Sequence, residues 1–470
     1  MKKTIIFTDL DATLQEGAPE ADSSAPAHRQ ELVGIFDAAL AAVDPYYAVL
    51  KAVHIENGQF CVADTNYDLA SFDRIIVVGA GKATARMALA IEALLGKKIA
   101  AGLIVVKKDH TAPLTIIEQV EASHPVPNEA GIAGAQHILH MVRGADEKTL
   151  VICLISGGAS ALLVAPIEGV TLQDKQEATR LLLNAGATIN ELNAVRKHLS
   201  AIKGGRLAQA AFPAQLVTLI VSDVIGDPLD VIASGPTSPD NSTFAEAWTV
   251  IEKFGLQEKL PPRVADYLQH GIAGQVPETV KPDDPCLTGT RNVIVASIRQ
   301  ALAAAQEEAT QLGFVTKTIS DKLHGEARDA ARLLVQAART EMTRIKPNER
   351  HCLLSGGETT VTVHGTGMGG RNQELALAFA LDIEGDQKMS LLSAGTDGTD
   401  GPNDAAGAIV DGGTASRARN LGIDPRSYLD NNDSYTFFQD FDTATGTQQS
   451  HLKTGPTGTN VMDIQIVLLF

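Results

Sequence analysis

Lys82 follows two closely spaced glycines in the run Val77-Val78-Gly79-Ala80-Gly81-Lys82. Glycines after a strand permit a tight turn and a close approach of the backbone to a ligand, and a helix that begins there offers free N–H groups to an anion. The third glycine of a G-x-G-x-x-G fingerprint is missing, because Thr84 takes its place, and the spacing of a Walker loop is absent. We predict that Gly79, Gly81 and Lys82 bind an anionic cofactor; a plain turn is the alternative.

The sequence Ser-Gly-Gly occurs twice after an apolar run, at Ser156-Gly157-Gly158 and at Ser355-Gly356-Gly357-Glu358. Both are expected to be corners between a strand and a helix, and such corners lie at the sheet edge where open α/β folds bind ligands. Two ordinary corners without a ligand are the alternative. We assign both runs to cofactor binding, and Ser156 to substrate binding as well.

Asp223 and Asp227 are four residues apart on a Gly- and Pro-containing loop after an apolar run. Mg²⁺ needs only one or two carboxylates when phosphate and water complete its shell, so this pair is a candidate metal site. One of the two could instead be the general base that removes a hydroxyl proton, or both could simply form turns. Asp397 lies on a further loop in which acids alternate with glycines, which suits a metal ligand or a plain loop.

Arg371 follows four glycines in six positions, 365–370, and opens an Arg-Asn-Gln-Glu helix start. Its guanidinium could bind phosphate oxygens as a two-pronged fork. Arg196 and Lys203 belong to the densest basic stretch, 193–206, which either steers phosphate or carboxylate groups or forms a solvated helix face. We predict that Arg196, Lys203 and Arg371 contact the substrate, and that Lys82, Asp223, Arg371 and Asp397 are the cations and acids of a phosphoryl-transfer site.

These residues belong to an acidic chain of 470 residues with a formal net charge of −17. The length favours two domains, and the charge disfavours nucleic acid and anionic lipid as partners. The four cysteines form no C-x-x-C pair, and no apolar stretch reaches the length of a membrane span. We therefore expect a reduced, cytoplasmic protein without a membrane or nucleic-acid partner.

The elements that must position these residues alternate between strand-like and helix-length patterns, which predicts an α/β fold. We expect a larger Rossmann-like domain with a mostly parallel sheet, and a smaller C-terminal α/β domain that begins its sheet near 292–297 and ends with a strand near 463–470. The proposed limits are 1–28 for an extension and linker, 29–285 for the first domain and 286–470 for the second.

The motifs around Lys82, Asp223 and Arg371, together with Ser123-His124-Pro125-Val126-Pro127, resemble those of the glycerate 2-kinases that carry a C-terminal MOFRL domain. The resemblance runs from about residue 30 to the end. It implies two domains flanking a cleft, ATP with Mg²⁺ or another divalent cation, D-glycerate phosphorylated at its 2-hydroxyl, and site roles for Lys82, Asp223 and Arg371. We add Asp397 as a second candidate for the base, and a homodimer as one candidate assembly.

Three other functions compete with this interpretation. Members of the same family have also been named hydroxypyruvate reductases, but the incomplete dinucleotide fingerprint does not support NAD(P)H binding. Asp9-Leu10-Asp11-Ala12-Thr13 resembles the first motif of haloacid-dehalogenase-type phosphatases, with Asp9 as nucleophile and Asp11 as acid/base, although a linker-like segment follows at once. A non-catalytic protein that binds sugar acids is the third alternative.

Overall fold

The computed structural model describes residues 25–446 and 449–470, and these form two compact units. The parallel-sheet unit comprises 43–297 and 458–461, and the mixed-sheet unit comprises the helix at 25–42 with 298–457 and 462–470. Asp9 and Asp11, the proposed phosphatase motif, lie outside the described residues.

The parallel-sheet unit is built on six parallel strands in the order β6-β5-β4-β7-β8-β9. In chain order this is 3-2-1-4-5-6, the arrangement of the Rossmann fold, so the predicted Rossmann-like domain is confirmed. The two middle strands, β4 and β7, pair with each other, and the strands that follow them in sequence, β5 and β8, lie on opposite sides of this pair, so the switch point is between β4 and β7. The strands are β4 (Arg74–Ala80), β5 (Ile99–Lys107), β6 (Glu118–Ala122), β7 (Thr149–Ile155), β8 (Gln215–Val221) and β9 (Thr290–Ala296).

The predicted limits of the first domain differ from the structure at both ends. Residues 292–297 were expected to begin the sheet of the second domain, but β9 pairs in parallel with β8 and completes the first sheet. The helix expected near residue 29 was placed in the first domain, but α1 (Ala25–Ala42) packs against α11 (Ile298–Gln311) of the mixed-sheet unit. Sequence periodicity identifies these elements but does not reveal their partners.

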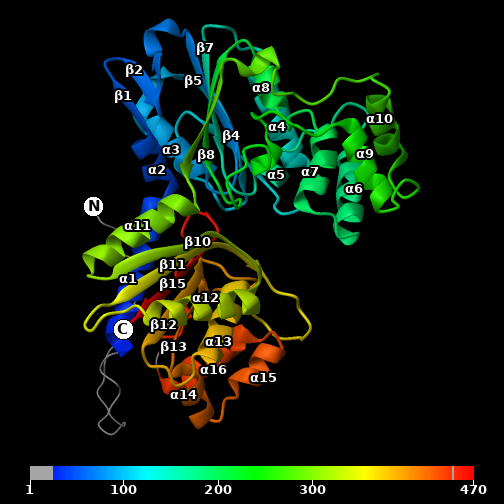
Figure 1. Cartoon of the computed structure of the whole chain (residues 1–470). Helices are drawn as coiled ribbons and strands as arrows, with labels where there is room; N and C mark the ends of the chain where they lie inside the picture. The colour runs from blue at the N-terminus through cyan, green and yellow to red at the C-terminus, as the bar shows by residue number, and fades with distance from the viewer. Residues whose placement is uncertain (1–24, 447–448) are drawn as a thin grey trace. The chain divides into compact units, whose positions relative to one another are not determined.

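Helices cover both faces of the parallel sheet (Figure 1). Alternate side chains of β4 pack with α4 and α8 in one apolar core, as the pleat of a strand requires, while α3 lies on the other face. A small antiparallel sheet, β1-β2-β3, was not predicted. The remaining elements named here are β1 (Val53–Glu56), β2 (Gln59–Val62), β3 (Thr65–Asp68), α2 (Pro45–Ala52), α3 (Thr84–Leu95), α4 (Glu129–Arg143), α5 (Ala159–Leu162), α8 (Arg206–Ala211), η1 (Leu69–Ser71), η2 (Gly96–Lys98), η3 (Ile232–Ser234) and η4 (Pro285–Leu287).

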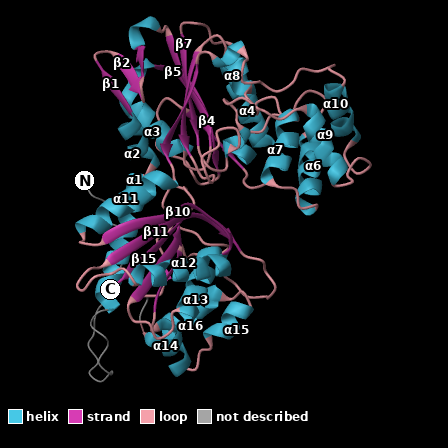
Figure 2. Ribbon diagram, viewed as in Figure 1, coloured by secondary structure: helices cyan, strands magenta, loops and turns pink. Residues whose placement is uncertain are grey.

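Four further helices of this unit form a group of their own beside the sheet-covering helices (Figure 2). They share a separate apolar core. Three of them begin with a reciprocal capping box, in which a Thr hydroxyl and an acid three residues later satisfy each other's backbone N–H groups. The helices are α6 (Leu172–Asn184), α7 (Ile189–His198), α9 (Phe244–Lys253) and α10 (Pro262–Ile272).

The mixed-sheet unit contains six strands in the order β10-β11-β15-β12-β13-β14. The expected last strand is confirmed: β15 lies between β11 and β12 and is antiparallel to both. All seven of its residues are buried. The strands are β10 (Val315–Glu326), β11 (His351–Thr360), β12 (Met389–Gly395), β13 (Gly407–Asp411), β14 (His451–Leu452) and β15 (Asp463–Leu469).

Helices α1 and α11 cover one face of the mixed sheet, and α12, α13 and α16 share an apolar core with its other face. Over the described residues, no single helix is long and apolar enough to cross a bilayer. The helices not yet given are α12 (Ala327–Met342), α13 (Arg371–Asp382), α14 (Thr414–Asn420), α15 (Pro425–Asp430) and α16 (Ser434–Thr445).

Candidate functional site

Two predicted motifs meet at the switch point of the parallel sheet, beyond the carboxyl ends of β4 and β7. The backbone N–H of Lys82 donates to the carbonyl of Gly157 over 2.8 Å, and the N–H of Ser156 donates to the carbonyl of Ala80 over 3.2 Å. The Ser156 hydroxyl, 1% exposed, accepts the N–H of Ala83 at 3.0 Å. The structure therefore brings the Gly79–Lys82 turn and the Ser156–Gly158 turn together, and Ser156 holds the two turns in place.

Glycine is required at this junction because the neighbouring atoms approach very closely. Gly81 has φ +143°, and a Cβ atom there would lie 2.1 Å from the Ser156 hydroxyl oxygen. A Cβ atom on Gly157 would lie 2.2 Å from Oδ2 of Asp223. Asp223, predicted as metal ligand or base, therefore lies directly against the Ser156–Gly158 turn, and the three predicted motifs converge.

Two histidines that the site assignment missed also lie here. The Cβ position of Gly158 is 3.1 Å from Cδ2 of His124 and 3.2 Å from Cγ of Lys82, and Nδ1 of His110 lies 3.1 Å from the carbonyl oxygen of Lys82. Burial, and then the charges of Lys82, Lys107 and His110, lower the pKa of His124 to about 4. Burial also lowers the pKa of His110. The only available signal for His124 was its place in the Ser-His-Pro-Val-Pro motif.

The electrostatics at the switch point favour an anion. Lys82 and Lys107 lie close enough to depress the pKa of His124, although the chain as a whole carries a large negative charge. Both histidines are neutral at pH 7, so each can donate a hydrogen bond to a ligand or accept one from it without adding charge. Asp223 lies against the adjacent Gly157, so the arrangement offers a cation, neutral donors and one carboxylate to a bound anion.

The second predicted metal ligand, Asp227, has an unusual environment. Its backbone is left-handed, with φ +58°, and its buried Oδ1 has no hydrogen-bond partner. Within 25–446 and 449–470, no three His, Cys, Asp or Glu side chains gather into a metal-binding group. An orphaned carboxylate oxygen close in sequence to Asp223 nevertheless fits a cation whose remaining ligands are phosphate and water.

The basic stretch is neither a solvated face nor a set of free cations. Lys203 is 1% exposed, and its Nζ donates to the carbonyl (2.9 Å) and hydroxyl (3.2 Å) oxygens of Ser160 and to the carbonyl oxygen of Ala233 (3.2 Å). Burial lowers the pKa of Lys203 well below its usual value. Lys203 thus ties α5 to η3, whereas Arg196 is only partly buried, with Nη2 3.5 Å from the carbonyl oxygen of Ser160.

In the mixed-sheet unit, Arg371 is already paired. Its Nε and Nη2 donate to the two carboxylate oxygens of Asp463 at 2.6 and 2.9 Å, and Nη1 lies 2.8 Å from Oε1 of Glu358. Burial alone would lower the pKa of Arg371, but the hydrogen bonds and charge of Asp463 raise it above its usual value. Asp463 is fully buried in β15, and no sequence motif marked it as a site residue.

Arg371 and Glu358 line a hollow of about 560 Å³ together with the glycine-rich segment 367–370. Of the run Ser355–Glu358, only Glu358 is among the described residues that line it. The expected corner is absent, because Ser355, Gly356 and Gly357 lie inside β11, where the Ser355 hydroxyl donates to Gln465. Gly356 is needed because a Cβ there would lie 2.4 Å from Cγ1 of Ile298.

The remaining side chains of the Arg-Asn-Gln-Glu motif face the interior. The backbone N–H groups of Asn372 and Gln373 donate to the Asp400 carboxylate at 3.0 and 2.9 Å, so Asp400 caps α13. Burial raises the pKa of Asp400 to about 6. Asp397, by contrast, accepts the N–H and hydroxyl of Thr399 at 3.1 Å, which is a local turn.

Comparisons with known proteins agree with this architecture. A family model described as a domain of unknown function (DUF4147) matches residues 31–269, and the MOFRL family model matches residues 351–463. D-glycerate 2-kinase of Thermotoga maritima is 43% identical over 401 residues, which cover 85% of this chain and 91% of that protein. A crystal structure of glycerate kinase from the same organism superposes with a TM-score of 0.82 at 40% identity and covers 95% of this chain and 100% of that one. A relative from Agrobacterium vitis, provisionally named a hydroxypyruvate reductase, is 41% identical over 94% of this chain and 94% of its own length.

Proposed function

Because this chain belongs to the family of the glycerate 2-kinases, we propose that it transfers the γ-phosphoryl group of ATP to the 2-hydroxyl of D-glycerate, giving 2-phosphoglycerate and ADP. The observation that carries the proposal is 43% identity to a D-glycerate 2-kinase over 85% of the chain. The cluster of Lys82, His124 and Asp223 at the switch point supplies groups suited to an anionic substrate.

In the proposed reaction, Asp223 accepts the proton of the 2-hydroxyl while that oxygen forms its bond to the γ-phosphorus. The bond from phosphorus to the bridging oxygen breaks, and ADP leaves with the electron pair. Lys82 offsets the negative charge on the transferring group, because positioned cations stabilise a spread-out phosphoryl transition state. Neutral His124 donates or accepts a hydrogen bond beside Lys82, and Arg196 is assigned to the glycerate carboxylate.

Asp227 would hold Mg²⁺, and its buried, unpartnered Oδ1 supports this assignment. Asp223 would join it as a ligand if Asp397, and not Asp223, is the base. When bound, Mg²⁺ would supply positive charge to the phosphate oxygens. Asp397 remains the second candidate for the base. We assign Ser156 and Lys203 to positioning, since both side chains are buried and bonded to the loops that bear the site.

We propose that Arg371 binds phosphate by giving up its ion pair with Glu358 while it keeps its hydrogen bonds to Asp463. Its fork with buried Asp463 fixes the plane of the guanidinium, whereas Glu358 is 47% exposed and holds only Nη1. An exposed ion pair contributes about 0–1 kcal/mol. A phosphate group can therefore replace Glu358 at little cost while Asp463 stays bound.

The test is ADP formation, quantified by chromatography, with D-glycerate, L-glycerate or hydroxypyruvate as acceptor. Phosphorus NMR of the product then distinguishes 2-phosphoglycerate from the 3-phosphate. Lys82→Ala should lower kcat roughly 10³-fold, whereas Lys51→Ala, an exposed lysine on α2, should not. Reduction of hydroxypyruvate by NADH or NADPH, with no ADP formed from glycerate, would favour the reductase instead.

A cytoplasmic location and a homodimer remain predictions. The four cysteines are all free and buried, which supports a reducing compartment. Sedimentation of the purified chain would test the dimer.

A further inference from the structure

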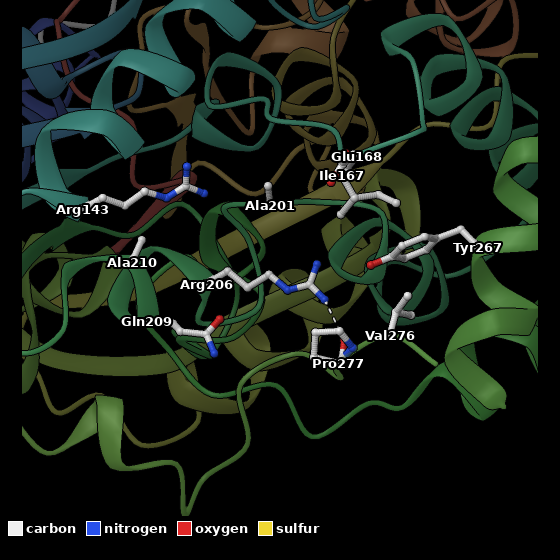
Figure 3. Close-up of a pocket in the computed structure, with 10 residues that line it drawn as sticks. All are labelled: Arg143, Ile167, Glu168, Ala201, Arg206, Gln209, Ala210, Tyr267, Val276 and Pro277. Atoms are coloured by element: carbon white, nitrogen blue, oxygen red, sulfur yellow. Dashed lines mark hydrogen bonds between the residues drawn. The ribbon is translucent and has the colours of Figure 1, made fainter. Parts of the chain in front are cut away.

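A second hollow lies in the parallel-sheet unit, among α4, α8 and α10 (Figure 3). Its volume is about 700 Å³, within the range of sites for small metabolites. None of the residues that line it belongs to the switch-point site or to the hollow beside Arg371. We call it the Arg206 hollow.

Two guanidinium groups face this hollow, and neither forms an ion pair with a carboxylate of the described residues. Arg206 donates from Nη1 to the carbonyl of Ser200 over 2.6 Å and from Nη2 to the carbonyl of Pro277 over 3.3 Å. A guanidinium has five N–H donors, so three remain uncommitted to the described residues. The side chain of Arg143, at the exposed end of α4, has no hydrogen bond or ion pair within the described part of the chain. In Figure 3 both side chains extend toward the middle of the hollow.

The other walls are suited to a small hydroxylated molecule. The Tyr267 ring enters from the side opposite Arg206, with its hydroxyl turned toward that guanidinium, and Gln209 adds an amide. Ile167 and Val276 provide apolar surface. Glu168 is exposed at the edge, where solvent screens its charge and its oxygens can accept from a ligand hydroxyl.

The charges identify the ligand class. We propose that the Arg206 hollow is a second ligand site that binds a small phosphate monoester carrying hydroxyl groups. A phosphate monoester has a charge of about −1.5 to −2 at pH 7, which matches two guanidiniums, and arginine binds phosphate oxygens in a two-pronged geometry. A monocarboxylate would leave one of the two cations uncompensated.

A ligand bound in the Arg206 hollow can affect the loops at the switch point. Arg206 lies three residues after Lys203, whose Nζ holds Ser160 and the Ala233 carbonyl. Arg206 itself holds the carbonyl of Ser200 at the start of the same segment. A phosphate bound to Arg206 thus acts on the short segment that also anchors the switch-point loops.

Binding is tested by calorimetry on the full chain carrying Lys82→Ala, which weakens phosphate binding at the switch point, and the Arg143 and Arg206 variants then identify the part of the signal that comes from the Arg206 hollow. The probes are glycerol 3-phosphate, 2-phosphoglycerate and glucose 6-phosphate, with glycerol and glucose as phosphate-free controls. At least one ester should bind with Kd below about 1 mM. Arg143→Gln and Arg206→Gln should each weaken it about tenfold or more. Arg180→Gln, an exposed arginine paired with Glu177 on α6, should not.

Arg143→Gln keeps the test decisive if Arg206→Gln fails to fold, because Arg143 is exposed and holds no described residue in place. The proposal is overturned if no ester binds below about 1 mM. It is equally overturned if glucose binds as tightly as glucose 6-phosphate, or if ester binding survives Arg143→Gln. Because the readout is binding and not turnover, the result is independent of whether the chain phosphorylates glycerate.

Discussion

Replacing Gly157 with alanine tests whether catalysis requires the Asp223 carboxylate to lie where the structure places it. The new Cβ would lie 2.2 Å from Oδ2 and 2.9 Å from Cγ of Asp223, whereas ordinary contacts begin at 3.4 Å. The carboxylate must therefore retreat by about 1 Å, and a displacement of that size can cost roughly 10²-fold in rate. Gly157 does not have a positive φ, so alanine can adopt its backbone conformation without strain.

The assay is steady-state ADP formation with D-glycerate, accompanied by thermal unfolding of the same variant. We expect kcat to fall about 100-fold with little change in Tm, because a side chain moves rather than the backbone. Gly34→Ala is the matched control, since nothing lies within 4 Å of a Cβ there. In an Asp223→Ala background, Gly157→Ala should have almost no further effect. Near-normal turnover of the single variant, or an undiminished effect in that background, would refute the reasoning.

Three further predictions follow from the contacts of Arg371, His124 and Lys203. Asp463→Asn should lower the free energy of unfolding by about 1.5–3 kcal/mol, because it weakens two hydrogen bonds from the half-buried Arg371 to a fully buried partner, whereas Glu358→Gln should cost less than about 1 kcal/mol; denaturant titrations that gave equal losses would contradict this difference in burial. By NMR, His124 should titrate at about 4 and Lys82→Ala should raise its pKa. With a pKa of about 4, His124 binds fewer protons in the folded state than in the unfolded state. Its contribution to stability is therefore present above pH 6.5 and is lost as pH falls toward 4. A pKa near 6.5 would show that burial and the charge of Lys82 do not act on His124 as proposed. Lys203→Met should lower the free energy of unfolding by about 2–3 kcal/mol, since it leaves the Ser160 and Ala233 carbonyls without their lysine donor; an unchanged denaturation midpoint would show that the tie is not needed.

Much of the parallel-sheet unit could be predicted from the sequence. The apolar runs at 74–78, 101–106, 150–155 and 216–221 all lie within β4, β5, β7 and β8. Turn glycines after β4 and β7 also indicated which loops would carry chemistry. The short, polar strand β6 and the small sheet β1-β2-β3 escaped prediction, because four or five residues without a clear apolar alternation give no periodic signal.

The site could be predicted only where local sequence determines geometry. The glycine turns near Lys82 and Ser156 were recognised because backbone conformation depends on nearby residues. The partner of Arg371 was not, since Asp463 is 92 residues away and becomes its neighbour only when β15 pairs with β11. Lys203 was expected to reach the substrate because sequence shows its charge but not its burial.

The central position of β15 constrains how the chain can be synthesised and folded. During translation, the ribosome releases β11 and β12 before residues 463–469 exist, so each of these strands waits with an unpaired edge. Such edges invite pairing with other chains. A premature stop anywhere before 463 would remove the middle of the sheet together with the partner of Arg371. We therefore expect truncated products to aggregate or be degraded. We also expect the chain to need chaperones mainly while its C-terminal half is being synthesised.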